Sequence, residues 1–174
     1  AEIARKEGLF DWLASKAVKA AKGSASRLFL LVYIVGTVVT VFLSNDACAV
    51  VLTPAVYAAT KAAKAENPLP YLFICAFIAN AASFVLPISN PANLVVFAQN
   101  MPPLPQWPAV FALPSAPAIL ATYAVLRLTQ NATLKVTSVA TDVARVELSA
   151  TGRVVGFGIV ATAFVLVCAS ASGL

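Results

Sequence analysis

The chain of 174 residues is 60% hydrophobic and only 11% charged, and its mean hydropathy is +0.87. Soluble domains usually carry about 25% charged residues, and the apolar residues here come in long blocks, so the composition excludes an ordinary soluble fold. The net charge is +5, but Lys and Arg flank the apolar blocks and form no basic surface interleaved with aromatic residues. We therefore predict an all-α integral membrane protein in contact with the lipid bilayer, with no nucleic-acid partner.

The chain has few residues that could carry soluble-enzyme chemistry. It has no histidine, and its three cysteines, Cys48, Cys75 and Cys168, are far apart in the sequence. This excludes the usual zinc clusters and a disulfide framework, and no phosphate-binding or nucleophile motif is present. We expect no enzymatic activity, no cofactor and no metal site.

Residues 1–27 are more polar than the rest of the chain. Apolar residues recur at helical spacing between Gly8 and Lys22, and lysines gather toward the end of that stretch. A short basic amphipathic helix that carries Trp12 is typical of a segment lying in the membrane interface. We expect residues 1–27 to form such an interfacial segment.

The first apolar block is divided by a polar tip. Residues 28–43 would reach about 24 Å as a helix, which is short of a hydrocarbon core of about 30 Å. Ser44-Asn45-Asp46 follows, and a second apolar run extends from residue 47 to about 59 before Lys61. Two short arms around a polar tip favour a re-entrant hairpin, which is tolerated where protein or water surrounds it. Two full spans, with the tip exposed on the far side, are the alternative.

The second apolar block, residues 69–99, is also interrupted. Residues 71–86 read as a good helix, but Pro87 and Pro91 break it among Ser89, Asn90 and Asn93. Proline removes a backbone donor and disfavours helix in the preceding residue. Because residues 94–98 resume the apolar run, we predict a discontinuous transmembrane helix.

Three further segments complete the chain. Residues 100–108 form a proline-rich turn in which Trp107 is a candidate interfacial anchor. Residues 110–126 read as a span kinked at Pro114 and Pro117, residues 129–153 as a polar loop, and residues 154–171 as the last span. If residues 1–27 lie inside, residues 61–68 and 127–153 lie inside too, and every Lys and Arg falls on that side. This pattern follows the positive-inside rule.

Asp46 is the only acidic residue within an apolar block. Ionisable groups at membrane depth are costly and usually mark an ion pathway or a proton relay. Asp46 is therefore our candidate proton-coupling group. An alternative role is to cap the helix that begins at residue 47, and one carboxylate can serve both roles.

Neutral polar side chains stand at both interruptions: Ser44 and Asn45 at the tip, and Ser89, Asn90 and Asn93 at the break. Broken helices expose backbone amides and carbonyls that suit small polar or ionic ligands. We predict that these residues and Asp46 bind the substrate, although the side chains could instead satisfy only the freed backbone.

Four further residues are secondary candidates. Asn80 and Ser83 either line the same cavity or join helices by hydrogen bonds. Thr53, next to Pro54, kinks the outgoing arm of the hairpin or contacts the ligand. Cys48 either packs in the core or offers a thiolate to a soft metalloid, whereas Cys75 and Cys168 read as packing.

These motifs resemble a known family. Ser44-Asn45-Asp46-Ala47 running into Leu52-Thr53-Pro54 resembles the first hairpin tip of the arsenical pump membrane proteins, which are arsenite and antimonite efflux permeases of the ion transporter superfamily. A second motif resembles the next helix of that family. It consists of Ile78-Ala79-Asn80-Ala81-Ala82-Ser83, followed by Pro87-Ile88-Ser89-Asn90-Pro91-Ala92-Asn93-Leu94. The resemblance covers roughly residues 28–130, and both motifs occur in the family's order.

The resemblance implies a function. Such a protein would export arsenite or antimonite across the inner membrane in exchange for protons, with the tip and the broken helix as substrate contacts. Some relatives work with a soluble ATPase, so the resemblance allows such a partner. A Na⁺/H⁺ antiporter or an anion transporter of the same superfamily, and a membrane subunit that transports nothing, are the alternatives.

The family is built from two inverted repeats, each with one hairpin and one broken helix, whereas this chain holds one of each. We therefore expect residues 28–128 to be the end of a first repeat and residues 154–174 to be the first span of a second. On this interpretation the chain, which runs from Ala1 to Leu174, is the interior of a longer polypeptide, and its partner is the missing remainder of an inverted-repeat transporter.

Overall fold

The computed structural model describes residues 2–103, 106–136, 138–140 and 146–171. In these ranges the chain is almost entirely helical, and one isolated bridge joins Ser24 to Ser138. The elements, in chain order, are α1 (Glu2–Lys6), α2 (Leu9–Ala21), α3 (Ala25–Phe42), η1 (Ala47–Leu52), α4 (Thr53–Ala62), α5 (Leu69–Ala81), η2 (Pro87–Ser89), α6 (Pro91–Phe97), η3 (Ala98–Asn100), η4 (Pro108–Ala112), α7 (Leu113–Thr129), α8 (Asn131–Val136) and α9 (Ala150–Ala171).

Among the described residues, two helical stretches are long and apolar enough to cross a membrane. They are Ala25–Phe42 and Pro108–Thr129, and three shorter apolar helices cover Ala47–Ala62, Leu69–Ala81 and Ala150–Thr162. The all-helical prediction is thus confirmed for the described residues, and each expected apolar block contains helix.

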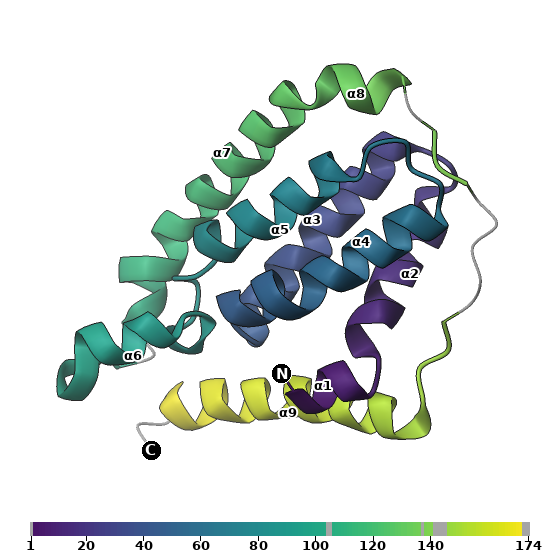
Figure 1. The fold of residues 1–174 in the computed structure, drawn as a ribbon. Helices are drawn as coiled ribbons and strands as arrows, with labels where there is room; N and C mark the ends of the chain where they lie inside the picture. The colour runs from purple at the N-terminus through teal and green to yellow at the C-terminus, as the bar shows by residue number, and fades with distance from the viewer. Residues whose placement is uncertain (1, 104–105, 137, 141–145, 172–174) are drawn as a thin grey trace.

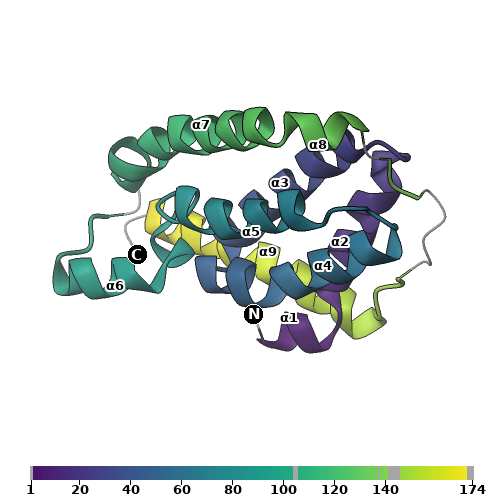
Figure 2. The same cartoon turned by 45° about the horizontal axis from the view of Figure 1, so that its top comes forward.

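Helix α3 lies at the centre of the packing. It packs against α2 on one side and α5 on the other, and both α2 and α5 also contact α4. The two arms of the predicted hairpin, α3 and α4, are therefore held together largely through α2 and α5 (Figure 1). Helix α7 lies along the outer side of α5, and α9 runs across the other helices beside α1 (Figure 2).

Helices α3 and α5 approach each other closely at Gly36. A Cβ atom at this position would lie 2.9 Å from Cγ2 of Ile78, which is closer than normal packing allows. Small residues at helix interfaces let backbones come together in membrane proteins. Gly36 therefore fixes the distance between the incoming arm of the hairpin and the helix that precedes the break.

Tyrosines join α3 to α7. The Tyr33 hydroxyl donates a hydrogen bond to the Ile119 carbonyl at 2.6 Å, and the Tyr33 and Tyr123 rings lie edge to face with centroids 5.1 Å apart.

Pro117 stands inside α7 and leaves one backbone carbonyl without its usual donor. The outward side of α7 is apolar and exposed, at Leu113, Leu120 and Leu128 among others, which suits a surface that meets lipid.

Helix α2 differs from the sequence-based expectation. Its apolar face, which includes Phe10, Ala14 and Val18, is buried against α3 and α4, whereas we expected that face to enter the membrane interface. The amphipathic pattern cannot distinguish lipid from another helix as the apolar partner, because both bury the same stripe.

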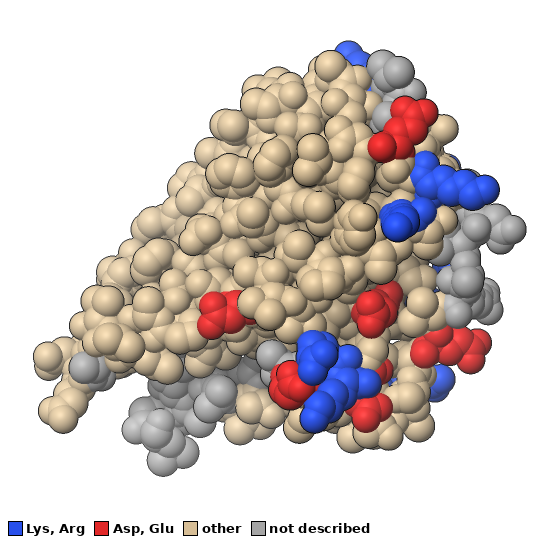
Figure 3. All heavy atoms as spheres, in the orientation of Figure 1, with Lys and Arg blue, Asp and Glu red and all other residues tan. Residues whose placement is uncertain are grey.

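Charged side chains are unevenly distributed. On the face shown in Figure 3, Lys and Arg gather toward the right-hand side of the molecule, and the part over α6 and α7 at the left is free of charge. This separation agrees with the grouping of basic residues expected from the sequence.

Candidate functional site

The tip of the hairpin is a compact turn between α3 and η1. The Ser44 hydroxyl accepts a hydrogen bond from the Ala47 amide at 3.2 Å, and Asn45 Oδ1 accepts one from the Asp46 amide at 2.8 Å. Ser44 also donates its own amide to the Val39 carbonyl at the end of α3. Ser44 thus acts as the helix cap that satisfies the first free amides of the outgoing arm.

Asp46 does not have the capping role that was one alternative for it. It makes no side-chain capping bond to η1, because Ser44 already occupies the geometry in which a side-chain oxygen meets the amide three residues later. The Asp46 side chain is exposed, and among the described residues no hydrogen bond or ion pair is found for its carboxylate. The carboxylate is free to meet a ligand or a proton.

The outgoing arm begins with a π-helical stretch, η1. Its last turn is closed by the Thr53 amide and the Thr53 hydroxyl, which both donate to the Cys48 carbonyl. Pro54 has no amide hydrogen, so the normal α-helical bond at that position cannot form. The kink predicted at Thr53-Pro54 is therefore present as a wide, π-helical turn. Such turns are frequent at functional sites.

The second interruption is present and is longer than predicted. Helix α5 ends at Ala81 rather than at residue 86, and the chain continues through η2 to α6. The carbonyls freed by this early ending find side-chain donors. Asn93 Nδ2 donates to Ser83 and Pro87, and Trp107 Nε1 donates to the Phe84 carbonyl at 3.0 Å.

Trp107 is therefore buried in protein and not at a membrane interface. Its side chain is fully buried, and its ring packs against Phe97 and Phe111. The interfacial role expected for it is wrong, because its indole N–H serves the broken helix.

Ser89 connects the break to the tip. Its hydroxyl donates to the Val41 carbonyl at 2.9 Å, three residues before Ser44, and accepts from the Leu86 amide at 3.1 Å. Helix η2 packs against the end of α3 accordingly. The structure thus brings the two polar interruptions to the same end of α3, as the transporter interpretation requires.

The six predicted site residues divide into two groups by burial. Ser89 and Asn93 are 0% and 2% exposed, and their described hydrogen bonds go to backbone groups. Asp46 is exposed, and Ser44, Asn45 and Asn90 are half-buried. Asn45 and Asn90 use only Oδ1 in their described bonds, to the Asp46 and Ala92 amides, which leaves their amide nitrogens as donors to a ligand.

The secondary candidates do not converge on the tip. Asn80 is exposed and donates to the Ala76 carbonyl of its own helix, while the buried Ser83 hydroxyl donates to the Asn80 carbonyl. Within the ranges that the structure describes, the side chains of this pair neither join helices nor line a shared cavity. Thr53 shapes η1, and Cys48 is buried with its thiol against the Cys75 carbonyl.

Sequence reasoning missed two features near the site. The first is that Cys75, read as packing, lies beside Cys48. The second is Thr40, which is fully buried with no hydrogen-bond partner for its hydroxyl among the described residues. Thr40 and Cys75 each stand in an uninterrupted apolar run, so no local signal distinguishes them from packing residues.

A cavity of about 1150 Å³ lies between α2, the end of α3 and α9. Its walls are mainly apolar and include Phe42 and Leu43, and Lys16, Lys19 and Arg153 stand on its lining. It reaches the residues just before the tip, but none of the six predicted site residues lines it.

Comparisons with known proteins agree with the membrane interpretation. Residues 1–172 match the model of the CitMHS family, described as a citrate transporter. The chain is 34% identical over 90 residues to a putative arsenical pump membrane protein of Bacillus subtilis (strain 168), covering 51% of this chain and 20% of that protein. It is 33% identical over 92 residues to an arsenical pump membrane protein of Escherichia coli, covering 52% of this chain and 21% of that protein.

An arsenical pump membrane protein of Yersinia enterocolitica is 32% identical over 92 residues, with the same coverage. The chain thus covers about a fifth of the length of these relatives. No solved structure matches it. The family match extends over nearly the whole chain, and with the apolar helices it identifies a membrane transporter rather than an enzyme. The chain belongs to the CitMHS family of membrane transporters.

Proposed function

We propose that the complete transporter containing this chain exports arsenite or antimonite across the inner membrane in exchange for protons. The observation that carries this proposal is the chemistry of the tip: the exposed carboxylate of Asp46, for which the described residues supply no partner, lies among neutral hydrogen-bonding groups. Arsenite at neutral pH is mostly an uncharged trihydroxide, so it needs hydrogen-bond donors and acceptors and no fixed cation. The names of the curated relatives support this choice of substrate.

Each predicted site residue has a role in this proposal. Asp46 exchanges protons with the substrate path, and Asn45 and Asn90 offer amide nitrogens to the substrate oxygens. Ser44, Ser89 and Asn93 complete the substrate site by holding the tip and the break in position. Because the Asp46 carboxylate has no described partner of its own, a proton and the substrate can compete for it directly.

The architecture follows the same proposal. Residues 28–59 form a re-entrant hairpin, residues 69–99 a discontinuous span, and residues 1–27, 61–68 and 127–153 lie in the cytoplasm. Residues 28–128 close one repeat of an inverted-repeat transporter, and the helix that contains residues 154–171 opens the next. The short apolar arm Ala47–Ala62 and the interrupted helix after Ala81 support this arrangement.

The substrate is tested with the full-length gene in arsenite-sensitive cells that lack their own exporter. We expect the gene to restore growth on arsenite and Asp46→Asn to abolish the rescue, because the amide cannot carry the coupled proton. Asp11→Asn, which alters an exposed aspartate on α2, should leave the rescue intact. Equal membrane levels of the three proteins are verified by immunoblot. Rescue of growth on sodium alone would contradict the arsenite proposal.

An anion transporter or a Na⁺/H⁺ antiporter of the same superfamily is the second candidate. The family description as a citrate transporter favours an anion, and Lys16, Lys19 and Arg153 on the cavity next to the end of α3 supply cations. Uptake of labelled citrate that is lost in Lys16→Gln and unaffected by Asp46→Asn would favour this candidate over arsenite export.

A further inference from the structure

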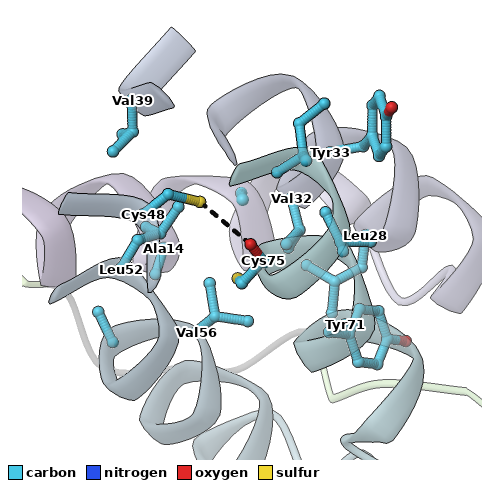
Figure 4. Packing of buried hydrophobic residues seen from close by; sticks show 14 of the residues in the cluster. Ala14, Leu28, Val32, Tyr33, Val39, Cys48, Leu52, Val56, Tyr71 and Cys75 are labelled. Carbon is cyan, nitrogen blue, oxygen red and sulfur yellow. Dashed lines mark hydrogen bonds between the residues drawn. The ribbon is translucent and has the colours of Figure 1, made fainter. Parts of the chain in front are cut away.

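Helix α2 has two faces with different surroundings. Phe10, Ala14 and Val18 on one face are buried in the core, and Figure 4 shows Ala14 there among apolar side chains of other elements. The other face, with Trp12 and Lys16, lines the cavity of about 1150 Å³ that α2 shares with the end of α3 and with α9. Most small-molecule pockets measure roughly 300–1,000 Å³, so this cavity has room for a large ligand.

The walls of this cavity expose large apolar side chains. Phe42 on α3 is 42% exposed, and Phe157 and Val160 on α9 are 75% and 66% exposed. Exposed apolar patches mark surfaces that meet a lipid, a ligand or another protein. The cavity therefore suits a ligand with extended hydrocarbon parts, which a small carboxylate such as citrate lacks.

Basic side chains stand on the same lining. Lys16 and Lys19 come from α2 and Arg153 from α9, and Glu147 is the acidic residue among those described there. Within the described ranges, none of the three cations forms an ion pair. Lys16 Nζ lies 5.5 Å from the centre of the Trp12 ring, so this cation also contacts the apolar wall. A net positive charge beside apolar walls complements an anionic amphiphile.

We propose that this cavity binds an anionic phospholipid of the cytoplasmic leaflet. Its headgroup meets Lys16, Lys19 and Arg153, and its acyl chains lie along the apolar walls. Basic pockets between membrane helices on the cytoplasmic side bind anionic lipid headgroups. The proposed topology places residues 1–27 and 127–153, and with them all three cations, on that side. A zwitterionic phospholipid would leave the net positive charge unbalanced, and a free anion would leave the apolar walls uncovered.

The bound lipid lies next to the hairpin tip. Leu43 lines the cavity, and it directly precedes Ser44, which caps η1. The lipid therefore touches the end of α3, where the tip and the break meet. This inference depends on the proposed topology and not on the proposed substrate, so a failure of arsenite export leaves the lipid site in place.

The test is native mass spectrometry of the purified full-length transporter, incubated with phosphatidylglycerol or with phosphatidylcholine of the same acyl chains. We expect phosphatidylglycerol to bind at lower concentration. Each basic side chain near an anionic lipid surface contributes about a fivefold change in affinity, so Lys16→Gln/Arg153→Gln should weaken phosphatidylglycerol binding at least about tenfold. The matched control, Lys61→Gln/Arg27→Gln, removes the same charge from exposed residues outside the cavity lining and should weaken binding little.

A second pair of variants tests the apolar part of the site. Gly156 lines the cavity, and a Cβ there would lie 3.6 Å from Leu9 Cδ1, which is an ordinary contact. Gly156→Phe should therefore fill part of the cavity and displace the lipid while the cations stay in place. Gly158→Phe lies on the same helix with nothing within 4 Å of an added Cβ, and it should leave binding unchanged. Thermal unfolding in lipid-free detergent verifies that both variants fold.

Three results would overturn the inference. The first is equal binding of the two lipids, or equal binding by the cation variant and its control. The second is displacement of the lipid by citrate or inorganic phosphate at equal concentration, which would indicate a site for a free anion. The third is that no lipid stays bound and Gly156→Phe lowers the unfolding midpoint, which would mean that another part of the full-length polypeptide fills the cavity.

Discussion

At the scale of single residues, one hydroxyl keeps the two polar interruptions together. Ser89 Oγ donates to the Val41 carbonyl and accepts from the Leu86 amide inside a fully buried site. The tip differs from it, since the Asp46 carboxylate is exposed and makes no hydrogen bond or ion pair within the part of the chain that the structure describes. Polar residues with the same appearance in the sequence thus differ in burial: Ser89 is part of the scaffold, whereas Asp46 is accessible.

Removing the Ser89 hydroxyl should loosen the site. We expect Ser89→Ala to destabilise the protein by about 1–3 kcal/mol, because a buried carbonyl and a buried amide lose their partner. The midpoint of thermal unfolding in detergent checks this. Ser138→Ala removes an exposed hydroxyl and should shift the midpoint little. Equal midpoints for both variants would contradict the role given to Ser89.

At the scale of elements, the packing of α3 on α5 determines where the tip and the break meet. Gly36 allows this contact, because any Cβ there would strike Ile78.

A methyl group at Gly36 should therefore be costly. We expect Gly36→Ala to lower stability by about 1–3 kcal/mol through overpacking, even though alanine favours helix over glycine. Gly158→Ala on α9 is the matched control, since nothing lies within 4 Å of its added Cβ. Thermal unfolding of both variants checks the pair. If Gly36→Ala unfolds at or above the midpoint of the unaltered protein, α3 and α5 leave room for a Cβ at this position, which would contradict the close approach to Ile78.

Features of these elements that have a local cause could be predicted from the sequence, and features that depend on residues far along the chain could not. The interruption near Pro87 and Pro91 was predictable, because proline acts on its own residue and the one before it. The early end of α5 at Ala81 was not, since Asn93 and Trp107 satisfy its freed carbonyls from farther along the chain. The pairing of Cys48 with Cys75 likewise depends on the packing of η1 against α5, which no local pattern encodes.

At the scale of the whole molecule, we propose that the chain closes one repeat of the transporter and opens the next. On the face shown in Figure 3, the part over α6 and α7 is free of charge. If residues 61–68 are cytoplasmic and residues 100–108 lie on the opposite side, the labelling of single cysteines introduced in these segments should differ accordingly. In a full-length transporter without other cysteines, Asn100→Cys should react with an impermeant maleimide in intact cells. Lys64→Cys should react only after permeabilisation. Both positions are exposed, so the reverse pattern would refute the proposed topology.

The central claim, that this family member couples arsenite to protons through Asp46, is tested most directly in proteoliposomes holding the full-length transporter. An arsenite gradient is imposed, and the internal pH is followed with a trapped dye. The account predicts proton movement opposite to arsenite in the unaltered protein and in Asp11→Asn, and none in Asp46→Asn. Arsenite flux without any proton movement, or full coupling in Asp46→Asn, would contradict it.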